Sequence, residues 1–363
     1  MKLVPPLRPL WFFLTLFLLS SLTGILLAQE TLRIQVRRGD SLSYLSFKTY
    51  GMYNREIADI LKRENPQIKE IDLIFAGQFL NFPTPESLKK KLAERSAKPL
   101  SPAGTQEVQE GRPSPPVVPT PGPLSETQVR AQNGVITFLE GGVQVKKSGE
   151  TQWVSARPNM ILSEKDQIRV PPQAKAELIL DNQSVLRLSG NTVLTLQKLE
   201  EEKATRKENT RVEMSLGRLW LKMGKLFNPA SRCDVRTPTV IAGVQGTIYQ
   251  LSVAGDQSTT IQVYEGAVRV YNPFPQAQPP DAGGPTQVEK PREVAGPKEV
   301  GGPKPVSREE WTQIVLHQYQ QIKVTGKGVP QPAPFDPARE RTNEWVRWNE
   351  ERDADFTPPA RPR

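Results

Sequence analysis

Residues 176–196 read AELILDNQSVLRLSGNTVLTL, three short apolar runs separated by two turn signals. The runs span Glu177 to Leu180, Val185 to Leu188 and Val193 to Leu196. Asp181-Asn182 and Ser189-Gly190-Asn191 supply residues that favour turns, because their side chains or their lack of one suit tight backbone geometry. This stretch therefore predicts consecutive β-strands of an all-β domain.

The same pattern extends over residues 127–272. Hydrophobic and polar residues alternate strictly from Val212 to Met223, and a final hairpin is predicted from Ile261 to Tyr271 around Glu265-Gly266. Strands that recur every 8–12 residues between turns are typical of a sandwich, a barrel or a β-solenoid.

Several motifs in this segment together resemble the FecR domain: Ala176-Glu177-Leu178, Leu216-Gly217-Arg218-Leu219, Val235-Arg236-Thr237-Pro238, Gly246-Thr247-Ile248-Tyr249 and Val263-Tyr264-Glu265-Gly266-Ala267-Val268-Arg269-Val270. The resemblance implies an all-β fold, for which we expect a sandwich or a β-solenoid. In the regulator that gave this family its name, the domain relays a signal across a membrane to a sigma factor. Only about nine residues precede the apolar run of the present chain, so we expect the fold without that iron signalling.

Residues 31–83 have a different pattern, in the order strand, helix, helix, strand. TLRIQV alternates like a strand, and Asp40 or Ser41 is suited to cap a first helix. Ile57, Ile60 and Leu61 recur at helical spacing, and FLNFP at residues 79–83 closes as a strand.

This segment resembles the LysM domain through Gly39-Asp40-Ser41-Leu42, Asn65-Pro66, Ile71 through Ile74, and Ala76-Gly77-Gln78. The resemblance implies binding of N-acetylglucosamine glycans, above all peptidoglycan, between two loops. The glycan-binding residues that it implies here are Gly39, Asp40, Ser41, Leu42, Asn65, Pro66, Ile68, Ile71 and Ile74. For each of these a structural interpretation stays open, since Gly-Asp-Ser-Leu also caps the first helix and the isoleucines also suit a core.

Residues 1–28 have a short positive region, an apolar run and a small residue at Ala28, as in a secretory signal peptide. An uncleaved anchor is the alternative, since the run is about as long as a membrane span. Either way we expect the rest of the chain in the periplasm or cell envelope, with no membrane span after cleavage and no contact with nucleic acid.

The remaining segments are predicted as connections and a tail. Residues 84–126 and 273–306 are rich in proline and glycine, as in linkers, with a short basic helix from Glu86 to Lys98. Residues 307–325 have a capping box and helical spacing, which predicts an amphipathic helix that packs on the β domain or binds a partner. Residues 326–363 are predicted to be a disordered tail.

The chain has one cysteine, Cys233, and one histidine, His317, among 363 residues. A catalytic triad would have to be built on His317 alone, a multi-histidine metal site is excluded, and carboxylate-only chemistry stays open. We expect no enzyme activity, no cofactor and no metal. The favoured function is a non-catalytic envelope protein that binds peptidoglycan through residues 31–83, with residues 127–272 or the C-terminal helix contacting an envelope protein. The alternatives are a signalling component with an uncleaved anchor and an accessory of a cell-wall enzyme.

Overall fold

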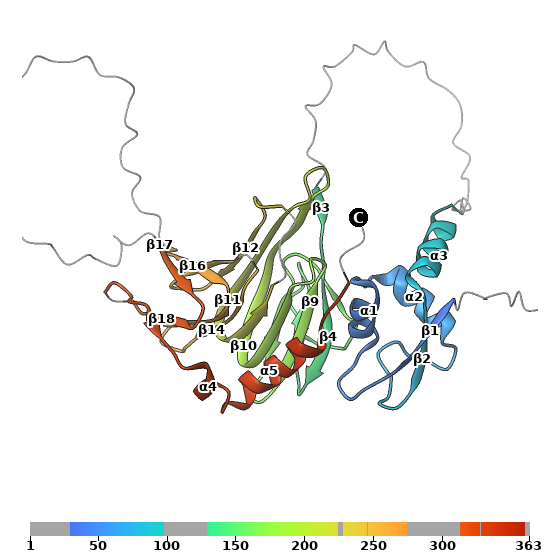
Figure 1. Cartoon of the computed structure of the whole chain (residues 1–363), viewed down its shortest axis with the longest axis horizontal. Helices are drawn as coiled ribbons and strands as arrows, with labels where there is room; N and C mark the ends of the chain where they lie inside the picture. Colours follow the sequence, from blue (N-terminus) through green and yellow to red (C-terminus); the bar gives the residue numbers. More distant parts are fainter. Residues whose placement is uncertain are drawn as a thin grey trace, which may run out of the picture.

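The computed structural model describes residues 30–97, 129–223, 228–244, 246–273, 313–326 and 328–359. They form a small N-terminal module, a large β domain and a C-terminal helix that lies across the β domain toward the module (Figure 1). The expected signal peptide and most of the two expected linkers fall outside the described residues. Within the described ranges, no helix combines the length and hydrophobicity needed to cross a membrane.

The module has the predicted order of strand, helix, helix and strand. Its elements are β1 (Thr31–Gln35), α1 (Leu42–Tyr50), α2 (Arg55–Glu64) and β2 (Phe79–Pro83). The two strands pair antiparallel, with Thr31 opposite Pro83 and Gln35 opposite Phe79. Both helices pack on this hairpin through an apolar core that includes Leu42, Ile57 and Leu80.

Local side chains fix the limits of the module helices. The Ser41 hydroxyl accepts the amide N–H of Tyr44 and begins α1, and Gly51 ends it in the left-handed region at φ 72°. Asn54 caps α2 in the same way by accepting the amide N–H of Ile57. The predicted cap at Ser41 is therefore confirmed.

The expected first linker begins with a helix that belongs to the module. α3 (Pro85–Ala97) confirms the short basic helix predicted from Glu86 to Lys98. Leu88 is buried in the module core, and Lys91 donates to Glu64 at 2.8 Å. A linker starting at residue 84 was therefore wrong over these positions, because Leu88 has core contacts that a linker lacks.

The β domain has seventeen described strands in one hydrogen-bonded sheet that closes into a barrel. They are β3 (Val129–Ala131), β4 (Gly134–Glu140), β5 (Gln144–Lys146), β6 (Val154–Ser155), β7 (Ile161–Leu162), β8 (Gln167–Val170), β9 (Lys175–Leu180), β10 (Val185–Glu202), β11 (Lys207–Lys222), β12 (Arg232–Arg236), β13 (Ile241–Val244), β14 (Ile248–Val253), β15 (Thr259–Glu265), β16 (Ala267–Tyr271), β17 (Gln313–His317), β18 (Gln320–Val324) and β19 (Ala333–Pro334). The all-β prediction is confirmed, but the expected sandwich or β-solenoid is replaced by a closed sheet.

The two long strands β10 and β11 explain the closure, since each pairs with different partners along its length. β10 pairs with β9 at Val185–Ser189 and with β8 at Thr192–Thr195. β11 pairs parallel with β12 near its start and antiparallel with β14 near its end. At the crossing, Gly217 has φ 104° and any side chain there would collide with Thr192.

The predicted helix over 307–325 was wrong, because the described part of this segment is a β-hairpin. β17 pairs with β16 and β18 pairs with β15, so both strands extend the barrel after the second linker. Leu316, Ile322 and Val324 are buried in the barrel core, and Tyr319 forms the turn at φ 64°. Free sheet edges at β15 and β16 outweigh the helical spacing, because they offer backbone hydrogen bonds to an added strand. The predicted capping box at residues 307–310 lies outside the described residues.

The predicted disorder of residues 326–363 was also wrong. This segment contains β19, α4 (Pro337–Glu340) and α5 (Glu344–Asp355). Asn343 caps α5 by accepting the amide N–H of Trp345, and the side chains of Trp345 and Val346 are buried. The helix is ordered because its apolar and charged residues meet partners on the barrel, as Figure 1 shows for its course across β10, β9 and β4.

Candidate functional site between the module and the barrel

The module, the barrel and the C-terminal segment meet in one shared apolar cluster, which we call the junction. Tyr44 and Phe47 of α1 are buried in it, together with Val135 and Ile179 of the barrel and Phe356 after α5. The ring of Tyr44 lies 5.7 Å from that of Phe356. Burial of aromatic side chains contributes strongly to association, so this contact is a packed interface between the parts.

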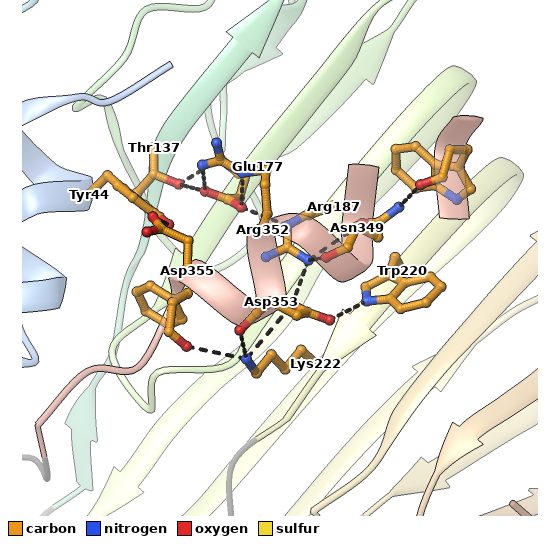
Figure 2. A network of polar contacts seen from close by, with 12 residues as sticks. Tyr44, Thr137, Glu177, Arg187, Trp220, Lys222, Asn349, Arg352, Asp353 and Asp355 are labelled. Carbon is orange, nitrogen blue, oxygen red and sulfur yellow. Dashed lines mark hydrogen bonds and ion pairs between the residues drawn. The ribbon is translucent and has the colours of Figure 1, made fainter. Parts of the chain in front are cut away.

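A buried carboxylate, Glu177 on β9, lies next to the junction and is held by two guanidinium groups (Figure 2). Arg187 on β10 donates its Nε at 2.6 Å, and Arg352 on α5 donates Nε at 2.9 Å and a terminal nitrogen at 2.7 Å. The Thr137 hydroxyl completes the set at 2.8 Å. Because Glu177 and Arg187 are both fully buried, each needs these partners to stay charged.

Asp353 extends the network from the other side of α5. Its carboxylate accepts Arg187 at 2.6 Å and the indole N–H of Trp220 at 3.0 Å. Lys222 donates to the backbone carbonyl oxygens of Asp353 at 2.7 Å and Phe356 at 3.2 Å. Figure 2 shows these groups converging on one turn of the helix. The last turn of α5 is therefore fixed to the barrel by charge-assisted hydrogen bonds, which are the strong class.

The protonation states in this network follow from burial and opposite charge. Burial would raise the pKa of Glu177, but the guanidiniums of Arg187 and Arg352 outweigh it and lower that pKa from 4.5 to about 2. Burial lowers the pKa of Lys222, and the nearby Asp353 opposes that change. Glu177 is thus ionised at neutral pH, and the network carries both signs of charge.

The same helix also reaches the module. Asp355 accepts the Tyr44 hydroxyl and the Lys48 ammonium, each at 2.9 Å. The Arg352 guanidinium lies 4.8 Å from the Tyr44 ring centroid and 4.9 Å from that of Phe138. α5 therefore contacts barrel and module at once. We call residues 349–356, the end of α5 together with Phe356 after it, the clasp.

A second bridge between the two parts is made by one side chain of the barrel, Asn159. Its carboxamide oxygen accepts the backbone N–H of Ser43 at 2.7 Å, and its nitrogen donates to the backbone carbonyl of Ile71 at 2.9 Å and to Asp72 at 3.4 Å. The backbone N–H of Asn159 is held by the Ile136 carbonyl of β4 at 2.7 Å. One amide group thus joins the first turn of α1, directly after the predicted loop at 39–42, to Ile71 in the other loop that the sequence indicated as a binding site.

The predicted glycan-binding residues separate into buried and accessible sets. Leu42, Asn65 and Ile68 are buried, and Asn65 holds the backbone of Asn81 through its amide. Ser41 is the cap of α1. These side chains have structural contacts, so a glycan would meet the backbone of their loops and not the side chains themselves.

The other predicted residues lie nearer the surface. Pro66 is exposed, and Ile71 and Ile74 are half-buried against the module core. Asp40 accepts the backbone N–H of Arg37 at 2.8 Å, and burial is the main cause of its raised pKa. Gly39 faces the barrel, where an added Cβ would lie 3.4 Å from the Phe138 ring. Of the two loops, the tips at Gly39 and Ile71 are therefore next to the barrel.

Sequence reasoning missed the residues that join the parts. Glu177 and Arg187 had a readable signal, because the predicted turn at Asp181-Asn182 places them directly opposite each other in the observed register. An acid and a base at facing positions of two apolar strands indicate a buried ion pair. Asn159, Arg352 and Asp353 had no such signal, since their partners are more than 80 residues away in the chain.

The site has no arrangement typical of catalysis. Cys233 is buried, and burial raises the pKa of its thiol to about 12, which suppresses the thiolate. Within the described ranges, no three His, Cys, Asp or Glu side chains gather as metal ligands would. The arrangement holds α5, the barrel and the module together.

Comparison with known proteins bears on the barrel. Residues 166–269 match the family model described as FecR protein. The match supports the predicted FecR domain over β8 to β16.

Two solved structures are similar to part of the chain. Both are of a candidate anti-sigma factor from Parabacteroides distasonis, with 15% and 16% identity and TM-scores of 0.32 and 0.34. They cover 48% and 50% of this chain, and the chain spans 62% and 64% of theirs, less than two thirds of either. No curated protein matches the sequence.

Proposed function

We propose that this protein is a non-catalytic signalling component of the bacterial envelope, whose signal is the separation of the module from the FecR domain. The observation that supports it most directly is the clasp, because α5 binds the barrel through the buried or half-buried ion pairs of Arg352 and Asp353 and binds the module through the more exposed Asp355. The FecR match supports an envelope role of this kind.

The chemistry of the clasp suits a contact with two discrete states. A buried ion network is often no more stable than apolar residues of the same volume, yet removing one partner is strongly destabilising. Arg352 and Asp353 therefore specify one closed arrangement and make partial opening costly. A ligand or partner that favours the open state would shift the whole unit between states.

A second candidate function is binding of peptidoglycan through the module. The confirmed order of strand, helix, helix and strand favours it, together with the convergence of Ser43, just after the loop at residues 39–42, and Ile71, in the loop at 65–74, on one amide group. Sedimentation with insoluble peptidoglycan tests it on the full mature chain. Retention that persists at high salt supports a specific glycan contact, since charge-only adsorption is screened by salt.

The signalling proposal is tested by opening the clasp in the source bacterium. Arg352→Met removes the guanidinium that joins Glu177 to the module side and keeps an unbranched apolar stem. The control is Arg341→Ala. Arg341 lies just before α5 and forms an exposed ion pair with Glu350 on α5, and this substitution breaks that pair. We expect the Arg352 variant to change a defined set of transcripts that the control leaves unchanged.

Hydrogen exchange of the purified variant shows independently whether the junction has opened. If exchange confirms opening and the transcripts of the Arg352 variant equal those of wild type, the signalling function is refuted. Protein abundance is measured alongside, so that loss of the chain is not mistaken for a signal.

A further inference from the structure

The barrel presents the carboxamide of Asn159 to the module. This group offers the same hydrogen-bond acceptor and donor as the acetamido group of a ligand. Asn159 is only 8% exposed, and its oxygen accepts from Ser43 while its nitrogen donates to the Ile71 carbonyl. A secondary amide has the same pair of groups, one acceptor and one donor. A backbone N–H and a backbone C=O therefore recognise either the carboxamide or an acetamido group.

The Ser43 N–H is open to such a group because of its place in α1. Ser41 caps the helix by accepting the next amide, that of Tyr44, which leaves the Ser43 N–H as one of the unsatisfied donors of the first turn. Ile71 lies half-buried against the apolar junction and offers its carbonyl from the second loop. The first group lies in the first turn of α1 and the second in the loop after α2, and the folding of the module brings them together.

The position of Asn159 is specified by the barrel. Its backbone is in the left-handed region at φ 66°, which asparagine tolerates better than most residues. The turn at 157–160 is tied to β4 by two hydrogen bonds with Ile136, from the N–H of Asn159 at 2.7 Å and to the carbonyl of Met160 at 3.0 Å. The carboxamide is thus delivered to the module by a rigid turn.

We propose that Asn159 is an internal occupant of an acetamide-binding site on the module, so that an N-acetylated glycan and the barrel compete for it. This rests on the proposed function, because it gives the ligand class that would separate the module from the FecR domain. In the closed state Asn159 fills the site while Tyr44 and Phe47 of the module pack against the barrel, and the apparent affinity for glycan is reduced by the fraction of molecules that are closed.

The test is calorimetric titration of the full mature chain with the tetramer of N-acetylglucosamine. Asn159→Ala removes the occupant, and Asn159→Asp keeps its shape but places a carboxylate opposite the Ile71 carbonyl and Asp72. The control is Asn191→Ala, an exposed asparagine that also has a left-handed backbone, at φ 61°. Circular dichroism checks that each variant is folded.

We expect both Asn159 variants to bind the tetramer at least about fivefold more tightly than wild type, from the loss of two hydrogen bonds in the closed state. The Asn191 variant should match wild type, and a glucose tetramer without acetamido groups should bind none of them. Equal affinity in wild type and both Asn159 variants overturns the competition. If neither wild type nor any variant binds the tetramer, the acetamide site is overturned. The signalling proposal is tested separately, by the transcripts of the Arg352 variant.

Discussion

Glu177→Gln tests whether the buried ion network around Glu177 holds the C-terminal helix on the barrel. The substitution keeps the size and shape of the side chain but removes the charge that pairs with Arg187 and Arg352. Two guanidiniums then face each other next to a neutral amide. Removing one member of a buried charge network costs about 3 to 5 kcal/mol, so we expect a loss of that size in the free energy of unfolding at pH 7.

The pKa of Glu177 gives a second measure of the same interaction. It falls from 4.5 to about 2 on folding, which corresponds to about 3 kcal/mol of stability. Because the folded-state pKa is the lower one, this stability is present above pH 4.5 and is lost as the pH falls through about 2. The difference between wild type and Glu177→Gln should therefore shrink progressively between pH 5 and pH 2.

Urea unfolding followed by tryptophan fluorescence measures both effects, since Trp220 and Trp345 are buried beside the clasp. The matched control is Glu213→Gln, an exposed glutamate on β11 that should change stability by no more than about 0.5 kcal/mol. A difference below about 1 kcal/mol at pH 7 for Glu177→Gln, or one that stays constant down to pH 2, would refute the reasoning.

Three further predictions follow from single contacts. Arg352→Met should open the junction and expose Tyr44, which hydrogen exchange of residues 42–50 would detect; unchanged protection there contradicts the role of the clasp. Gly217→Ala should destabilise the barrel by more than about 2 kcal/mol in urea unfolding, because the added Cβ would collide with the backbone of Thr192 at a φ that alanine rarely adopts; a neutral effect would show that the crossing strands move apart easily. Cys233 should resist thiol reagents at pH 8 in the native state and react fully in urea, since it is buried and its pKa is raised to about 12; rapid native labelling would contradict its burial.

The sequence predicted best where local patterns decide the structure. The turn at Asp181-Asn182 and the cap at Ser41 depend on neighbouring residues, and both are present. Strand alternation also placed buried residues such as Leu219 and Leu221 correctly in the barrel core. These features need no information about distant parts of the chain.

The sequence failed where partners are distant. Residues 313–324 have apolar positions compatible with a helix, but the edges of β15 and β16 draw them into strands. Trp345 lies in the segment predicted to be a disordered tail, and it packs on the protein's own barrel. The ion pairs of Asp353 with Arg187 and of Arg352 with Glu177 join residues separated by more than 160 positions, which no local pattern shows.

Hydrogen exchange at the backbone amide of Ser43 tests the central claim most directly, because the closed unit places the Asn159 oxygen 2.7 Å from that nitrogen. The amide of Tyr44, bonded within the module to Ser41, serves as the internal reference. If the module is docked on the barrel, the Ser43 amide exchanges as slowly as the Tyr44 amide in wild type. In Asn159→Ala the Ser43 amide exchanges much faster, while the Tyr44 amide stays protected. Rapid exchange of Ser43 in wild type, at the rate of a free first helical turn, would contradict the docking of the module on the FecR domain.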